Sequence, residues 1–163
     1  MASLRCVDTC SFIALRHYPR DLFDPLWNFM EELMAEGRLV APHEVLRELS
    51  KQDDEIYKWA KSQKSAFINL DSDQGAVLNE ILGAFPALAA AMKAGPHADP
   101  VVVSLALVRS RRDPNNPCAV VTEEKLRGEG SHKVPNVCKR FGLKTGTLLD
   151  VLREEGVKFE FRK

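Results

Sequence analysis

The feature that most constrains this fold is a short run that is apolar at every position, Cys-Ala-Val-Val at 118–121, followed by Thr122. A strand with one face in water alternates apolar and polar residues, whereas a strand of a parallel sheet covered on both faces is apolar throughout. Further short strands are predicted at 4–7 and 38–41 and, more weakly, at 143–145. Segments with helical spacing of apolar residues separate these strands, and this alternation predicts an α/β fold with a parallel central sheet.

Proline and acidic residues predict where two of the helices begin. Asp24 before Pro25 and Asp99 before Pro100 each place a capping side chain before a proline at the first helical position. The helix that begins at Asp99 continues as VVVSLALV, which is apolar on nearly every side, so this helix is expected to be buried. The remaining helices are expected at 11–17, after Pro42, at 53–65, 72–85 and 135–141, and in a last segment that ends at Gly156.

Length and composition predict one globular domain over residues 1–163. Hydrophobic residues make up 45% of the chain and charged residues 28%, which excludes a disordered protein. No apolar run is long enough to cross a membrane, and the amino-terminal segment lacks the apolar core of a signal peptide. A cytoplasmic protein without a membrane partner is therefore expected. Lys and Arg total 23, as do Asp and Glu, so any nucleic-acid contact must come from a local basic patch.

The four cysteines do not indicate a zinc site, because none of them forms a C-x-x-C pair. They are expected to be buried free thiols. CSFIALR at 10–16 fits the C-x5-R pattern of cysteine phosphatases, with Cys10 as nucleophile and Arg16 for the phosphate. A phosphate-binding loop needs exposed backbone N–H groups, and the apolar residues inside this segment favour a buried helix instead. A haloacid-dehalogenase-like site also fails, since it needs a second Asp where Cys10 stands.

Acidic residues follow two of the predicted strands at the point where each strand ends. Asp8 comes directly after the strand at 4–7, and Glu123 and Glu124 follow the strand at 118–121. Ligands of open parallel sheets bind beyond the carboxyl ends of the strands, where the strand order reverses. These positions therefore predict a site at that edge.

Three further acids belong to helices that start near the same edge. Glu44 and Glu48 are one helical turn apart after the second strand, and Asp99 begins the buried helix. Carboxylates gathered at one place raise one another's pKa unless a cation neutralises them. Such oxygen ligands suit Mg²⁺ or Mn²⁺, and two such ions can support hydrolysis of a phosphodiester.

Each acid, taken singly, also has a structural explanation. Asp99 is a helix cap by sequence, Glu44 lies where the helix dipole favours a negative charge, and Asp8 could cap the helix that follows it. The other glutamates fit a solvated surface. Only the combination of acids from distant segments indicates a shared site.

The ordered motifs resemble those of the PIN-domain nucleases, which include the VapC-type toxins of toxin–antitoxin pairs. The similarity lies in CVDTCSFI, APHEVLREL, ADPVVVSLAL and AVVTEEK. The TEEK segment and KVPNVC also resemble an uncharacterised PIN-like branch. The resemblance covers nearly the whole chain and implies a three-layer α/β/α domain with strand order 3-2-1-4-5. In that order Asp8 and Glu124 are expected to face each other at the switch point.

The resemblance also implies which residues form the site. The family's metal-binding acids correspond to Asp8, Glu48 and Asp99, and its small hydroxyl residue to Thr9. Glu124 aligns with the fourth acid, although the family more often has Asp there, so its contact to a metal could run through water. Glu123 is the substitute for Glu124, and Glu44 is the substitute for Glu48.

The implied activity is that of a Mg²⁺- or Mn²⁺-dependent endoribonuclease that hydrolyses RNA with a metal-activated water and forms no covalent enzyme intermediate. A toxin of this kind would pair with an antitoxin protein and could form a homodimer. The alternative is a non-catalytic PIN-like module that binds RNA or protein. The residues expected to contact the phosphates of the substrate are Lys125, Arg127, His132 and Lys133.

Overall fold

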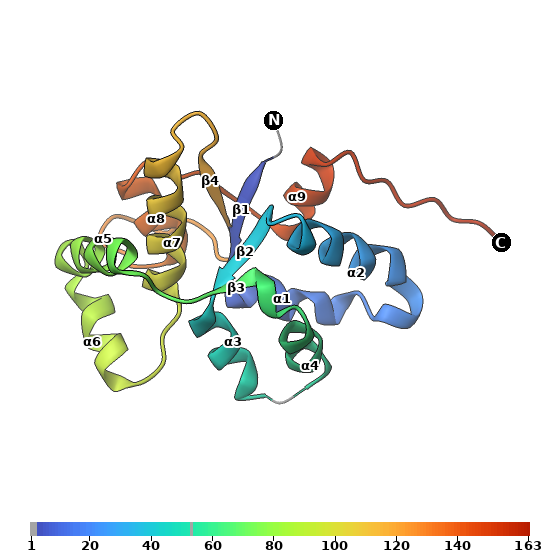
Figure 1. Cartoon of the computed structure of the whole chain (residues 1–163), viewed down its shortest axis with the longest axis horizontal. Helices are drawn as coiled ribbons and strands as arrows, with labels where there is room; N and C mark the ends of the chain where they lie inside the picture. The colour runs from blue at the N-terminus through green and yellow to red at the C-terminus, as the bar shows by residue number, and fades with distance from the viewer. Residues whose placement is uncertain (1–2, 53) are drawn as a thin grey trace.

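The computed structural model describes residues 3–52 and 54–163, and its centre is a parallel sheet of five strands in the order β3-β2-β1-β4-β5. All four strand pairs are parallel. The architecture confirms the predicted fold class, a three-layer α/β/α domain with this strand order (Figure 1). The strands are β1 (Leu4–Val7), β2 (Leu39–Pro42), β3 (Phe67–Ile68), β4 (Cys118–Val121) and β5 (Thr145–Gly146).

Helices connect the strands and cover both faces of the sheet. In Figure 1, α5 and α7 lie on one side of the sheet, and α2 and α9 lie on the other. The α-helices are α1 (Thr9–Ala14), α2 (Arg20–Ala35), α3 (His43–Ser50), α4 (Glu55–Ser62), α5 (Ser72–Ala84), α6 (Pro86–Ala94), α7 (Asp99–Arg112), α8 (Val134–Arg140) and α9 (Leu148–Glu154). Two short 3-10 helices, η1 (Leu15–His17) and η2 (Lys64–Ala66), follow α1 and α4.

The apolar helix predicted from VVVSLALV is the central helix of the fold. Every residue of α7 from Pro100 to Val108 is buried, as its sequence predicted. It packs against β1, β2 and β4 on one side and against α5 on the other. The first residue of α7, Asp99, is thereby placed close to the ends of the central strands.

The order of the strands reverses at β1. This strand pairs with β2 on one side and with β4 on the other, and Val7 lies opposite Val121. The ladder continues by one bond, because the backbone N–H of Asp8 donates to the carbonyl of Val121 at 2.8 Å. Asp8 and Thr122 are therefore neighbours at the carboxyl edge of the sheet.

Two elements were absent from the sequence prediction. Strand β3 is only two residues long, too short to give an apolar run, and α6 lies in a stretch read only as leading to a loop. The predicted strand at 143–145 is displaced to Thr145–Gly146, and the one at 38–41 to Leu39–Pro42. The predicted helix at 53–65 corresponds to α4, although its first residue lies outside the described residues.

The helix starts predicted at Asp24 and at Asp99 differ from the structure in different ways. At Asp24 the chain is already helical from Arg20, and a non-helical Phe23 (φ −122°, ψ 32°) kinks α2 just before Asp24. At Asp99 the prediction of a side-chain cap was wrong. Ala98 takes the cap position, and no side chain caps this helix. The carboxylate of Asp99 is therefore not used to hold its own helix.

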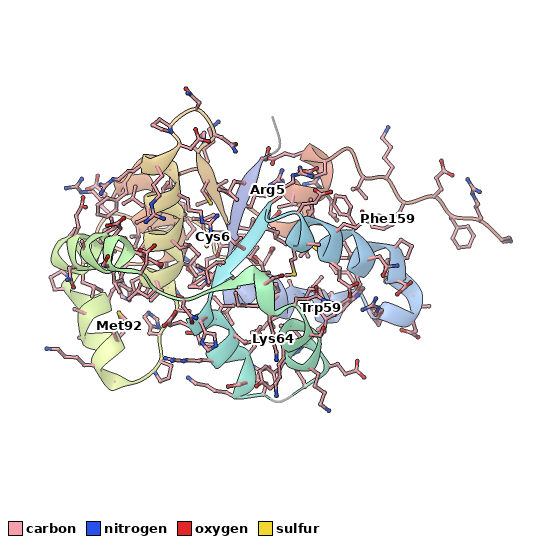
Figure 2. The ribbon with its side chains drawn as sticks, viewed as in Figure 1. Arg5, Cys6, Trp59, Lys64, Met92 and Phe159 are labelled. Carbon is pink, nitrogen blue, oxygen red and sulfur yellow. The ribbon has the colours of Figure 1, made fainter. Side chains whose placement is uncertain are left out.

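A buried arginine joins α9 to the opposite, amino-terminal end of β1. Arg5, labelled in Figure 2, is 2% exposed and donates to Glu154 at 2.9 Å and Glu155 at 2.7 Å. Arg38 donates to Glu155 as well. A buried guanidinium needs such paired carboxylates to offset its desolvation, so these contacts fix α9 against the sheet.

The four cysteines are free thiols, as predicted; Cys6, Cys118 and Cys138 are buried, whereas Cys10 is partly exposed, so the prediction of burial was wrong for Cys10. Within the described residues no single helix is long and apolar enough to cross a membrane. Helices α5 and α6 together have the length and apolar composition of such a segment, and they are bent by 115° relative to each other.

Candidate functional site

Asp8 is a buried carboxylate at the end of β1. Its side chain is 3% exposed and accepts hydrogen bonds from the backbone N–H of Thr9 at 2.8 Å and from the hydroxyl of Thr122 at 3.0 Å. Burial and, to a smaller extent, the negative charge of Asp99 raise the pKa of Asp8 to about 7, although the hydrogen bonds to its carboxylate oppose both effects. Removal of a carboxylate from water costs free energy unless a positive charge compensates it. Asp8 is thus a position where a cation would be favourable.

Cys10 contacts this carboxylate, and its thiol is held by hydrogen bonds within the protein. Its thiol donates to Asp8 Oδ2 at 3.3 Å, and its sulfur accepts from the backbone N–H of Glu123 at 3.2 Å. Burial and the adjacent Asp8 raise the pKa of the Cys10 thiol to about 12. A nucleophilic cysteine needs a lowered pKa, so this environment argues against the cysteine-phosphatase alternative.

Glu48 lies between two other elements of the site. Its Oε2 accepts from the hydroxyl of Thr9 at 2.6 Å, and its Oε1 accepts from the backbone N–H of Ala98 at 2.7 Å. Glu48 therefore links α3 to the first residue of α1 and to the residue before α7. The resemblance placed Thr9 beside the site, and the structure assigns it a specific contact, the short bond that orients Glu48.

Asp99 lies among the other acids. Burial raises its pKa; the charges of Glu124 and Glu48 raise it as well, while His97 and Lys133 lower it. His97 Nε2 is 3.6 Å from Asp99 Oδ2. Among the described residues no hydrogen bond reaches the Asp99 carboxylate.

The two glutamates after β4 point in different directions. Glu124 accepts from Lys133 Nζ at 3.2 Å and from the backbone N–H of Val134 at 2.8 Å, so it holds the start of α8. Glu123 accepts from Ser11 at 3.2 Å and from the backbone N–H at the start of α9 at 2.8 Å. The charge of Glu124 raises the pKa of Asp99, and this coupling favours Glu124 over its substitute Glu123 as a member of the acidic cluster. Thr122 links the segments that carry Asp8 and Glu124, because its Oγ1 donates to Asp8 and accepts from the backbone N–H of Glu124.

Glu44 occupies a different place from Glu48. Its side chain is 23% exposed and lies 4.0 Å from Arg47, and its buried Oε2 has no hydrogen-bond partner among the described residues. The contacts of Glu48 with Thr9 and Ala98 place Glu48, and not Glu44, beside the other acids.

The four residues expected to contact substrate follow β4 on one exposed segment. Lys133 is half exposed and pairs with Glu124, which places one cation beside the acids. Lys125, Arg127 and His132 are exposed, and within the described residues none of them forms an ion pair. Their side chains are therefore available to a polyanion at the edge of the site.

The acids form an electrostatic cluster, but they do not yet form a coordination shell. Across residues 3–52 and 54–163, no three His, Cys, Asp or Glu side chains are already arranged to hold one metal ion. Both carboxylate oxygens of Glu48 and of Glu124 are engaged by protein donors. These two side chains would have to exchange those donors for a metal.

Two contributors to the site were missed at the sequence level. Thr122 is signalled by its place directly after CAVV, since parallel pairing with LRCV puts it next to Asp8. His97 lies in the loop before α7, and its contact with Asp99 depends on the path of that loop. No spacing in the sequence indicates it.

Comparison with known proteins identifies a family. Residues 6–159 match the family described as Domain of unknown function (DUF4411), so the chain belongs to this family. No curated protein and no solved structure gives a significant match.

Proposed function

We propose that this member of the DUF4411 family is a metal-dependent endoribonuclease of the PIN-domain type, which acts as the toxin of a toxin–antitoxin pair. The observation that carries the proposal is the electrostatic coupling of acids from four separate segments. The charge of Asp99 raises the pKa of Asp8, and the charges of Glu48 and Glu124 raise the pKa of Asp99. These acids lie at the switch point of the parallel sheet, where such folds bind ligands.

The chemistry of the donor set fits a hard divalent cation. Asp8, Glu48, Asp99 and Glu124 offer carboxylate oxygens, which Mg²⁺ and Mn²⁺ prefer. Repulsion among the carboxylates, together with the burial of Asp8, gives a bound cation a favourable electrostatic environment. When bound, such an ion would activate a water molecule and stabilise the leaving oxygen of a phosphodiester.

The remaining residues of the site position these acids and balance their charge. Thr9 orients Glu48, and Thr122 supports Asp8 and the backbone before Glu124. Lys133 lies beside Glu124, so it is placed to attract a phosphate to the edge of the acidic cluster. Because Cys10 stays protonated, the protein supplies no covalent nucleophile there, in agreement with direct hydrolysis.

The resemblance to VapC-type toxins also suggests partners and location. We propose a cytoplasmic protein whose substrate is RNA, whose inhibitor is an antitoxin protein, and which can form a homodimer. Lys125, Arg127 and His132 are the exposed side chains that would contact the RNA together with Lys133.

A non-catalytic PIN-like module that binds RNA or protein is the second candidate. The observation that favours it is the engagement of Glu124, because Lys133 and the backbone of Val134 already bind both of its carboxylate oxygens. The two candidates differ in one respect that can be measured. The enzyme requires a divalent ion at the acids, whereas the binding module does not.

The test is RNA cleavage by the purified protein in Mg²⁺ or Mn²⁺, with an EDTA control and the variants Asp8→Asn and Asp99→Asn. The proposal predicts cleavage that stops in EDTA and in both variants. Cys10→Ser serves as the matched control at the same edge of the sheet, and cleavage should survive it. Cleavage that persists in excess EDTA or in Asp8→Asn would refute the proposal.

A further inference from the structure

A second feature of the carboxyl edge is a cleft of about 390 Å³ between α3, α4 and the end of β3. Its volume is within the range of small-ligand sites. Three of its lining side chains carry a positive charge, Arg47, Lys61 and Lys64, and none of the described residues that line it is acidic. Figure 2 labels Lys64 in the region between α3 and α4. The surface of this cleft is therefore opposite in charge to the acidic cluster.

The two lysines of the cleft are available to a ligand. Both are exposed, and among the described residues no carboxylate lies within ion-pair distance of either one. Lys61 Nζ lies 5.9 Å from the ring centroid of Tyr57, which also lines the cleft. Proteins that bind single-stranded nucleic acids combine cationic and aromatic side chains, because the cation binds a phosphate and a base stacks on the ring.

Helix α3 places this cleft next to the acidic cluster. Arg47 and Glu48 are consecutive residues, and the helix turns by about 100° from one to the next. One flank of α3 thus carries Glu48, and the adjacent flank lines the cleft. The strands give the same result, since β3 is two positions from β1 in the sheet, a separation of about 10 Å at the usual strand spacing.

We propose that this cleft, named here the α3–α4 cleft, binds a nucleotide of single-stranded RNA next to the bond that is cleaved. The proposal rests on the proposed function for its choice of RNA. Lys61, Lys64 and Arg47 contact phosphates, and an unpaired base lies against Tyr57. Double-stranded RNA keeps its bases stacked inside the helix and cannot offer one to the ring. The cleft therefore makes the protein selective for single-stranded segments such as loops.

The test is the binding of a short, fluorescein-labelled single-stranded RNA of mixed sequence, followed by anisotropy in EDTA so that metal-dependent cleavage does not interfere. The double variant Lys61→Gln/Lys64→Gln is compared with Lys58→Gln/Lys93→Gln, which removes the same charge from two exposed lysines that do not line the cleft. The proposal predicts that the slope of log affinity against log salt falls by about 1.4 in the first variant only, since each phosphate contact on a single strand contributes about 0.7.

The aromatic contact has a separate test. Tyr57→Leu should weaken binding of the single-stranded RNA by at least about fivefold and leave the weak binding of a duplex RNA unchanged. Tyr57 is partly buried against the core, so a thermal melt of this variant must show that it folds. The lysine variants lie at exposed positions and decide the question even if Tyr57→Leu does not fold.

The two proposals fail in different ways. Equal affinity and equal salt slope in the two double variants, or no RNA binding at all, would overturn the α3–α4 cleft, whatever the cleavage assay shows. Binding that depends on Lys61 and Lys64 in a protein that never cleaves RNA would support the cleft and would overturn the nuclease.

Discussion

Replacement of Asp8 by Asn should stabilise the metal-free protein at neutral and alkaline pH. In the unfolded chain Asp8 has its usual pKa of 3.8, whereas in the folded protein burial and Asp99 raise the pKa to about 7. Between these values the folded state holds a proton that the unfolded state has lost, so the free energy of unfolding decreases as the pH rises. At 1.36 kcal/mol per pH unit, the full difference is about 4 kcal/mol above pH 7 and is absent below about pH 4.

The variant Asp8→Asn has no charge to bury and should lack this pH dependence. Its amide oxygen can still accept from the backbone N–H of Thr9, while the contact with Thr122 must rearrange at a cost of about 1 kcal/mol. We therefore expect a net gain of about 3 kcal/mol at pH 8 and a small loss at pH 4. The assay is urea unfolding of both proteins in EDTA at several pH values. A difference between the two proteins that does not change with pH would refute the reasoning.

Three further changes test individual contacts of the site. Mn²⁺ should raise the midpoint of thermal unfolding of the wild-type protein, and Asp99→Asn should remove most of that increase; an equal shift in both proteins would place the ion elsewhere. Thr9→Val removes the short hydrogen bond to Glu48 and should lower the free energy of unfolding, measured in urea, by about 1.5–3 kcal/mol. Thr9→Ser keeps the hydroxyl and should retain most of the wild-type stability. Lys133→Gln removes the half-exposed ion-pair partner of Glu124, so the free energy of unfolding should change by less than about 1 kcal/mol. Calorimetry should show tighter binding of Mn²⁺ to this variant. Unchanged or weaker binding would show that Glu124 takes no part in holding the ion.

The central strands and the buried helix α7 could be predicted from the sequence because their burial leaves a strong pattern. A strand covered on both faces, such as β4, is apolar throughout, and α7 is apolar on all sides. β3 and β5 could not be placed in the same way, since each pairs over only two residues at an edge of the sheet. Their positions depend on the path of the connecting segments and not on a local signal.

The acids of the candidate site were predictable as a set, because the ends of parallel strands meet at one edge. The choice within each pair of glutamates was not. Glu48 and Glu44 share a helix, and only the position of Thr9 and of the chain before α7 shows that Glu48 belongs to the cluster. Glu123 and Glu124 are adjacent in sequence. Their side chains separate because Glu124 accepts a hydrogen bond from the backbone N–H of Val134 at the start of α8, whereas Glu123 accepts one from the backbone N–H of Leu148 at the start of α9.

The role of Asp99 shows how one local signal can have two meanings. An Asp before Pro predicts a helix cap, but in this chain Ala98 occupies the cap position and Asp99 is the first residue of the helix. Its carboxylate is thereby directed to a region that already contains negative charge, and its pKa rises. A cap would have stabilised the helix, whereas this arrangement places the carboxylate of Asp99 near the charges of Glu48 and Glu124.

The most direct test of the account is a crystal structure of the protein soaked in Mn²⁺, with anomalous diffraction used to locate the ion. The account predicts an anomalous peak in contact with Asp8 and Asp99, with Glu48 or Glu124 turned away from its present hydrogen-bond donors to complete the shell. An ordered site without a peak at a saturating concentration of Mn²⁺, or a peak held only by other residues, would contradict it.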